Sequence, residues 1–517
     1  MTIRSIRTAA TKARASRSPQ LFNGEPQRRR LPNGFVVDVG PNTMLRDDGA
    51  ALVGGSPEVV ALLAGMAQQY RDGTRFTVCD DDSALLVRDL LDAGLVHPVA
   101  AELPAVAAAD ITVVIPVKDR PQELQRLLDA IGGVLATIVV DDGSDDPSAT
   151  ERVAFSHDAR VVLLSENRGP GAARNAGLRE VHTPFVIFID SDVVVDPQRL
   201  LVLARHFADP AVGVVLPRVL GLFQGKDTNW LGRYEDSRSS LDLGEQPSFV
   251  HAGSVAPWAP GTCTVNRVDV IRDGFDEDMR VGEDVDIVFR IGLDGWRTRY
   301  DPSVVVWHDH RISLRPWFLR KIFYASSAHP LNARYPYYVV PSLLRPGDIA
   351  IGIAVLAQRK WSLPLIGAVT GVNALRTFRR LRAARMRHSG PVLTEPMVVS
   401  RHLAVGHLKA LLLHFASLLV RQWWPAAAAL SLISRRMRRA VLVAAVVDAV
   451  VFRTLNHADL DLPRYFVGRR LDDIGFGVGW WLSAWRARSV QGLLPDLRRP
   501  RWPSPRSALV TIVPAAK

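Results

Sequence analysis

The sequence predicts an α/β protein whose central part is a mostly parallel β-sheet with flanking helices. From residue 111 onward, apolar stretches of strand length alternate with segments of helical periodicity, as a parallel sheet requires. One of these stretches, residues 185–189, is an unbroken run of Phe, Val and Ile, which is typical of a central strand covered on both faces. Several stretches end on aspartates or glycine-rich loops, and parallel sheets bind ligands at the carboxyl ends of their strands.

Composition and charge divide the 517 residues into three parts. Residues 1–30 carry eight Arg/Lys and one Glu, residues 342–517 carry 27 Arg/Lys and eight Asp/Glu, and the segment between them has a net charge of −14. In the last third the basic residues interleave with apolar runs, which favours an anionic membrane surface as a partner and argues against nucleic acid. Cys79 and Cys263 provide neither a disulfide framework nor a metal cluster, so we expect the catalytic part in the reducing cytoplasm.

The first 109 residues predict a basic arm, a small domain and a linker. The arm, residues 1–30, is rich in Arg and Ser without periodicity, so we expect it to be disordered. Residues 31–98 have a pattern that resembles the winged-helix-like domains that bind precursor peptides; a packing domain without a ligand is the alternative. Residues 99–109 are rich in Ala and Pro, which is typical of a linker. The elements expected in the small domain are strands around 34–39 and helices over 57–70 and 83–93.

A second domain is predicted over residues 110–341. Its first helix, over 121–131, starts with proline at the first turn, a position that suits the fixed φ of proline. Because its first four strands should be parallel, their carboxyl ends meet at one edge, where we expect the active site. The predicted strands are 111–117, 136–140, 160–164 and 185–189, and the predicted helices are 121–131 and 170–179.

Two aspartate pairs follow strands of this sheet. Asp141 and Asp142 end the second strand, where a carboxylate can accept a hydrogen bond from a nucleotide base or a ribose; capping of the next helix is the alternative. Asp190 and Asp192 end the fourth strand. Carboxylate oxygens there suit Mn²⁺ or Mg²⁺, and the cation would bridge a diphosphate and assist its departure. A solvated Asp-Ser-Asp turn is the alternative.

Glycine-rich turns add to the same edge. Residues 167–175 form a glycine-rich entry to a helix, with Arg174 one turn inside, where a phosphate could bind. Gly261 lies in a Pro-Gly-Thr turn that we expect close to the acceptor.

A carboxylate and an imidazole complete the predicted site. Asp284 follows Glu283 at the start of a helix over 282–293 and is the candidate general base for an alcohol nucleophile; capping of the helix is its alternative. His308 ends another apolar strand and is the candidate nitrogen ligand of the metal, with His310 as the neighbour to test.

With these motifs in order, residues 111–310 resemble glycosyltransferase family 2, inverting transferases of the GT-A fold. The motifs are Val-Ile-Pro-Val at 114–117, Val-Asp-Asp-Gly-Ser at 140–144, Asn167 to Asn175, Asp-Ser-Asp at 190–192, Gly-Glu-Asp at 282–284 and Trp-His at 307–308. The resemblance implies a base-reading role for Asp141 or Asp142 and a ribose contact for Asp190. It implies further substrate contacts from Pro116, Val117, Arg174, Gly261 and Glu283, a metal on Asp192 and His308, and Asp284 as the catalytic base.

The resemblance implies a metal-dependent hexosyltransferase that takes its sugar, expected to be glucose, from a nucleotide-diphospho-sugar such as UDP-glucose. Combined with the small N-terminal domain, it implies a peptide-derived acceptor. Polysaccharide synthases of this family carry a Gln-x-x-Arg-Trp motif, and the Gln-Arg-Lys-Trp at 358–361 has the wrong spacing, which disfavours processive synthesis. The alternatives are a transferase for a cell-envelope lipid or polysaccharide, a sugar nucleotidyltransferase, and a peptide-holding scaffold with an inactive transferase domain.

The last part, residues 342–517, predicts apolar helices interrupted by arginines. None of its apolar runs reaches the roughly 20 residues that a spanning helix needs. We therefore expect helices that lie on the cytoplasmic face of the cell membrane, with helices of a soluble core as the alternative. The runs are 349–357, 361–375, 410–420, 425–433 and 440–451.

Overall fold

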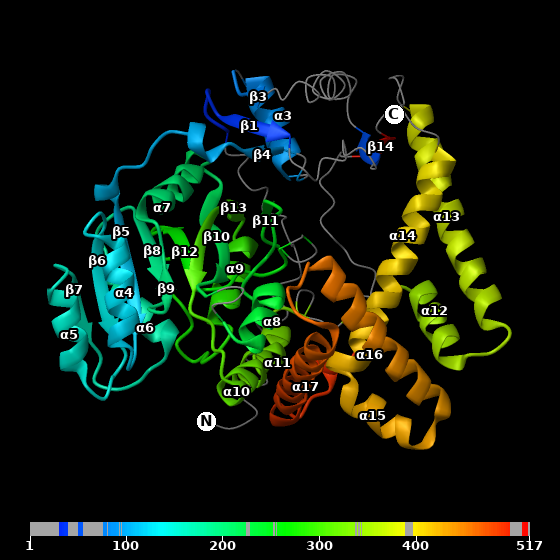
Figure 1. The fold of residues 1–517 in the computed structure, drawn as a ribbon. Coiled ribbons are helices and arrows are strands. Elements are labelled where there is room, and N and C mark those ends of the chain that lie inside the picture. Colours follow the sequence, from blue (N-terminus) through cyan, green and yellow to red (C-terminus); the bar gives the residue numbers. More distant parts are fainter. Residues whose placement is uncertain are drawn as a thin grey trace, which may run out of the picture.

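The computed structural model shows an α/β domain, a small N-terminal domain beside it and a C-terminal helical region (Figure 1). The expected basic arm, apart from Arg30, and the helix expected over 57–70 lie outside the residues that the structure describes. The described residues are 30–39, 50–54, 76–79, 81–92, 94, 96–223, 228–251, 254, 256–336, 339, 342, 344–387, 396–496 and 509–514.

A nine-stranded sheet forms the α/β domain, with the strand order β11-β13-β10-β12-β8-β5-β6-β7 and β9 paired to β13 (Figure 1). The neighbours β8, β5, β6 and β7 are parallel, which confirms the four predicted strands. β12 runs antiparallel to both β8 and β10, so the sheet is mixed. The strands are β5 (Ile111–Val117), β6 (Ala136–Asp141), β7 (Arg160–Leu163), β8 (Phe185–Ile189), β9 (Val193–Val194), β10 (Val212–Gly221), β11 (Ser248–Phe249), β12 (Cys263–Arg267) and β13 (Arg297–His308).

Helices cover both faces of this sheet. Alternate residues of β5 enter different cores: Val113 packs in one and Val114 in the other. α4 buries leucines and an isoleucine at helical spacing and ends at Gly132, whose φ of 58° is left-handed. The helices are α4 (Pro121–Ile131), α5 (Pro147–Phe155), α6 (Pro170–Leu178), α7 (Pro197–Ala204), α8 (Trp230–Arg238) and α9 (Glu283–Leu293).

The small domain is a three-stranded antiparallel sheet with one helix. Its strand order is β3 (Phe76–Thr77), β1 (Val36–Val39), β4 (Val96–Pro98), and α3 (Asp81–Asp92) packs beside it. Arg88 of α3 donates to both carboxylate oxygens of Asp209 in the α/β domain, at 2.6 and 2.7 Å, and both side chains are buried. This bidentate pair fastens the small domain to the sheet domain. Within the expected linker, two short 3₁₀ turns form at Ala100–Glu102 and Ala108–Asp110.

The C-terminal region is helical, as predicted, and lies against the α/β domain (Figure 1). α17 approaches α10 closely because Gly479 leaves room for the Ile322 carbonyl, which a Cβ at that position would meet at 2.1 Å. The helices are α10 (Leu314–Ala325), α11 (Ala328–Arg334), α12 (Pro346–Ala357), α13 (Ser362–Arg387), α14 (Pro396–Ser417), a π-helical turn η5 (Leu418–Gln422), α15 (Trp424–Ile433), α16 (Arg435–Leu455) and α17 (Leu462–Arg486); β14 (Leu509–Pro514) pairs with β2 (Ala50–Gly54).

One feature of this region differs from expectation. Among the described residues, the stretch Ser400–Gln422 is long and apolar enough to cross a membrane by length and composition. No apolar run of that length was expected, because histidines and a lysine interrupt the sequence of α14. A core helix of a soluble protein can be equally long and apolar.

Candidate active site

The sheet brings the predicted residues to one edge. Asp141 is the last residue of β6, and Asp190 follows β8, with its backbone N–H bonded to Thr262 O at 3.0 Å. The β9–β13 pairing places His308 opposite Val193, and the Asp309 N–H donates to Asp192 O at 2.9 Å. Strand pairing therefore joins Asp192 and His308, which lie 116 positions apart in the chain.

The two aspartates after β6 have different contacts. Asp142 accepts from the backbone N–H of Arg168 at 2.7 Å and of Gly169 at 2.9 Å, one with each oxygen. Asp141 accepts from the Ser144 N–H at 2.7 Å with Oδ1, whereas its Oδ2 is buried without a partner in the described part of the chain. A buried acceptor without a donor is costly, so Asp141, rather than Asp142, has the oxygen suited to a ligand N–H.

Arg174 is buried at the centre of the site. Its guanidinium donates to Glu283 Oε1 at 2.9 Å and to Asp190 Oδ1 at 2.7 Å, and it lies 3.4 Å from Gly261 O. Arg174 therefore holds together three other predicted residues. Its contact with a phosphate stays a prediction, as do the substrate contacts of Pro116 and Val117, which end β5.

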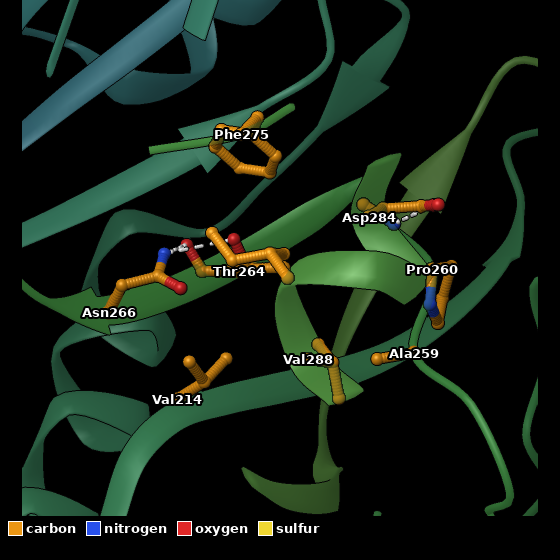
Figure 2. Close-up of a pocket in the computed structure, with 10 residues that line it drawn as sticks. Val214, Ala259, Pro260, Thr264, Asn266, Phe275, Asp284 and Val288 are labelled. Carbon is orange, nitrogen blue, oxygen red and sulfur yellow. Dashed lines mark hydrogen bonds between the residues drawn. The ribbon is translucent and has the colours of Figure 1, made fainter. Parts of the chain in front are cut away.

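Asp284 lies on the first turn of α9, next to the turn that contains Gly261. Its Oδ2 accepts from the Gly261 N–H and its Oδ1 from the Val285 N–H, each at 2.8 Å. Burial raises the pKa of Asp284 above the ordinary carboxyl value, although these two hydrogen bonds and Arg174 oppose the rise. Figure 2 shows Asp284 near Pro260 at a cavity of about 10 Å³, the space of roughly one water.

Asp192 and His308 form the candidate metal site. Asp192 Oδ1 lies 3.4 Å from His308 Nε2, while Asp192 Oδ2 contacts the Arg120 guanidinium. Burial disfavours the ionised carboxylate, but His308 and Arg120 outweigh it and lower the pKa of Asp192. His310 contacts His308, with 3.0 Å between their Nδ1 atoms, and burial lowers its pKa to about 3.

A divalent cation fits between these two side chains. Octahedral ligands at about 2.1 Å and at right angles are about 3.0 Å apart, close to the observed separation of oxygen and nitrogen. The described residues contain no cluster of three metal-ligating side chains. Such a cation would therefore take its other ligands from water and from a diphosphate, as Mg²⁺ sites commonly do.

Several residues at this edge escaped the sequence reasoning. Arg120, between Asp119 and the first residue of α4, contacts Asp192. Arg311, Arg320 and Tyr324 come from the segment that follows His308. Isolated arginines in a loop or on a helix have no distinguishing pattern in one sequence, so only the fold reveals them.

A larger cavity of about 450 Å³ lies beside the turn that leads to Asp284. Its walls are residues 278–281, α11 and the end of α17, including Arg280, Arg334 and Arg486. Gly282, which follows the first wall, packs against Ser327, since a Cβ there would meet the Ser327 Cβ at 2.9 Å. The C-terminal helices thus complete a cavity with a wall that ends three residues before Asp284 in the chain.

Known proteins share these features to different extents. The family model described as glycosyl transferase family 2 matches residues 112–275. The pre-mycofactocin glycosyltransferase of Mycobacterium tuberculosis is 40% identical over 484 residues, which cover 91% of this chain and 99% of the relative. Poly-beta-1,6-N-acetyl-D-glucosamine synthase of Staphylococcus aureus is 23% identical over 241 residues, 42% of this chain and 57% of the relative.

Among solved structures, similarity is found with a mannosyltransferase from Pyrobaculum calidifontis in complex with GDP-Man and Mn²⁺. The two chains are 20% identical with a TM-score of 0.33, over 68% of this chain and 91% of that one. Sequence identity is higher with the mycobacterial relative, at 40%. That similarity extends well beyond residues 112–275, which the family model matches.

Proposed function

Because the chain belongs to glycosyltransferase family 2 and has its GT-A fold, we propose that it transfers a hexose from a nucleotide-diphospho-sugar to a hydroxyl of a peptide-derived acceptor, with inversion at the anomeric carbon. We propose UDP-glucose as the donor and mycofactocin or its precursor as the acceptor, on the name of the 40% identical relative. The observation that carries the proposal is the convergence of Asp141, Asp284 and the Asp192–His308 pair at one sheet edge.

Asp284 acts as the general base in this proposal. Its carboxylate accepts the proton of the acceptor hydroxyl while that oxygen bonds to the anomeric carbon and the bond from this carbon to the diphosphate oxygen breaks. Burial raises the pKa of Asp284, which makes the carboxylate a stronger base than an exposed one. The Gly261 and Val285 N–H groups fix its orientation.

The residues proposed to bind the donor lie at the same sheet edge and end or follow β6, β8 and β13. The free Oδ2 of Asp141 accepts from a base N–H, and Asp190, oriented by Arg174, accepts from the ribose. Asp192 and His308 would hold Mn²⁺ or Mg²⁺, and the cation would neutralise charge on the departing nucleoside diphosphate.

The 450 Å³ cavity is the proposed room for the acceptor. Its volume lies within the roughly 300–1,000 Å³ that small-molecule sites occupy. Residues 278–281, which form one wall, precede Gly282 and Asp284 in the chain, and Asp284 itself lines the smaller cavity. The small N-terminal domain has no part in this proposed acceptor site, because Arg88 attaches it to Asp209 at the amino end of β10, whereas the acids lie at the carboxyl ends of β6 and β8.

We also propose that the C-terminal helices attach the protein to the cytoplasmic face of the cell membrane. The end of α15 exposes Leu432 and Ile433, which are 82% and 84% accessible. Four arginines follow at the start of α16, between residues 435 and 439. Exposed apolar side chains beside arginines suit a bilayer with anionic headgroups.

The same helices favour a second candidate, transfer to a lipid or polysaccharide acceptor of the cell envelope. A scaffold with an inactive transferase domain is less consistent with the site, because Asp284 and Asp192, the acids proposed for catalysis and metal binding, are both held at the sheet edge.

The test is to incubate the protein with Mn²⁺, a panel of nucleotide sugars, and either a peptide-derived or a lipid acceptor, with products read by mass spectrometry. We expect the peptide-derived acceptor to gain a hexose from UDP-glucose, with release of UDP. Proton NMR of the product should show inverted anomeric configuration. Release of pyrophosphate would indicate a nucleotidyltransferase, and transfer to the lipid alone would select the second candidate.

A further inference from the structure

Helix α10 lies between α17 and the active-site edge (Figure 1). Ile322 and Ala325 pack at Gly479, and Phe318 packs at Gly475 on the same partner helix. Arg320 and Tyr324, one turn apart, lie on another side of α10, where the guanidinium is 5.3 Å from the tyrosine ring.

That side of α10 faces the catalytic carboxylates. Burial raises the pKa of Tyr324 to about 12, and the negative charges of Asp190, Asp284 and Asp192 add to the rise although Arg320 opposes it. The Arg320 side chain therefore lies beside Tyr324, whose pKa is raised by the charges of all three aspartates. The C-terminal helices, which hold α10 in place, thereby position this side chain.

The loop before α10 brings a second arginine to the same place. Its start is fixed by the bond from the Asp309 N–H to Asp192 O at 2.9 Å, and its end by the bond from Asn229 Nδ2 to Ile312 O, also at 2.9 Å. Arg311 lies between these two anchors. Burial and the nearby charges of Arg320 and Arg120 lower the pKa of Arg311, while Asp192 opposes this change.

The three guanidinium groups have few counter-charges. Arg120 contacts Asp192, whereas no ion pair is found for Arg311 or Arg320 in the part of the chain that the structure describes. The nearby Asp190 is already paired with Arg174. Two arginines without an ion-pair partner in the described part of the chain, next to a third, suit an anion that carries more than one charge.

We infer that Arg120, Arg311 and Arg320 form a binding site for the diphosphate of the donor and of the nucleotide product. The inference rests on the proposed function. Guanidinium groups bind phosphate oxygens through paired N–H donors, and they lie beside Asp192 and His308, where a cation would hold the same diphosphate. A lipid phosphate offers the same chemistry, but the cluster lies at the strand ends beside the catalytic acids.

Calorimetry with UDP and Mn²⁺ tests this inference on the full chain. We expect R311A and R320A each to weaken UDP binding by about tenfold or more, because each removes a charge-assisted hydrogen bond. Uridine, which lacks phosphates, should bind both variants as it binds the wild type. The control is R315A, an exposed arginine on the same helix, which should bind UDP as the wild type does. Unchanged melting temperatures establish that the variants fold, with R311Q and R320Q as replacements for any that do not.

Two results would contradict the inference. One is unchanged UDP affinity in both R311A and R320A. The other is loss of binding to anionic vesicles with UDP binding intact, which would assign the arginines to lipid phosphates. Failure of the proposed function looks different, because the wild-type protein would then bind neither UDP nor GDP.

Discussion

At the scale of single residues, the protonation of Asp284 should govern the pH dependence of transfer. A base must be ionised to act, and burial raises the pKa of this carboxyl above its ordinary value of about 3.9. We therefore expect kcat/KM to fall as the pH drops through this raised pKa, at a higher pH than an exposed aspartate would give. A rate profile that stays flat down to the ordinary carboxyl range would show that Asp284 is not the base.

Asp192 should control metal-dependent donor binding. Asp192→Ala removes the oxygen that lies 3.4 Å from His308 Nε2, so a cation would keep a single protein ligand. We expect Mn²⁺-dependent UDP affinity to fall by at least about tenfold, since one charge-assisted contact is lost. Calorimetry with and without Mn²⁺ measures this, and Asp196→Asn, at the N-cap of α7, is the control. An unchanged metal affinity would remove Asp192 from the metal site.

The sequence predicted which acids lie at the sheet edge but not their contacts. Carboxylates at strand ends predicted Asp141, Asp190 and Asp192, because the pattern of apolar strands determines where the ends lie. Which aspartate after β6 keeps a free oxygen depends on the path of the 168–169 loop. The path of this loop depends on tertiary contacts that no local sequence pattern encodes. The same holds for the contact between Arg120 and Asp192.

At the scale of elements, the Arg88–Asp209 pair should stabilise the attachment of α3 to the sheet domain. Arg88→Ala leaves a buried carboxylate without its partner, which typically costs about 3–5 kcal/mol. Urea denaturation followed by circular dichroism measures the loss. The Arg30–Asp81 pair of the same domain is exposed, so Arg30→Ala should change the free energy of unfolding very little. Equal effects of the two substitutions on the free energy of unfolding would show that the Arg88–Asp209 pair does not stabilise this attachment.

Elements with strong local signals were predicted closely. β5 and α4 begin and end at the predicted residues, because an apolar run and a proline-started amphipathic helix are both local patterns. The antiparallel insertion of β12 between β8 and β10 was not predicted, since its partners are distant in the chain. The winged-helix interpretation of the small domain depends partly on residues outside the described part and stays a prediction.

At the scale of the whole molecule, we expect the C-terminal helices to bind anionic membranes. Replacing both Leu432 and Ile433 by Asp removes exposed apolar contacts next to the arginines of α16 and should reduce co-sedimentation with vesicles that contain phosphatidylglycerol. Vesicles of phosphatidylcholine alone should bind the wild type less, because they lack the anionic headgroups. Equal binding of wild type and variant to both kinds of vesicle would contradict membrane attachment through this face. The exposed Leu163 in the α/β domain offers a control, as Leu163→Asp should leave vesicle binding unchanged.

The central claim is that this fold transfers a hexose with Asp284 as the base, and the most direct measurement compares wild type with Asp284→Asn in one transfer assay. Hexose addition to the peptide-derived acceptor is followed by mass spectrometry, while UDP affinity is measured by calorimetry. We predict that the variant keeps donor affinity near the wild-type value and loses at least about a hundredfold in turnover, as loss of a general base implies. Asp273→Asn, an exposed acid ahead of α9, should behave as the wild type. Full turnover by Asp284→Asn would contradict the account.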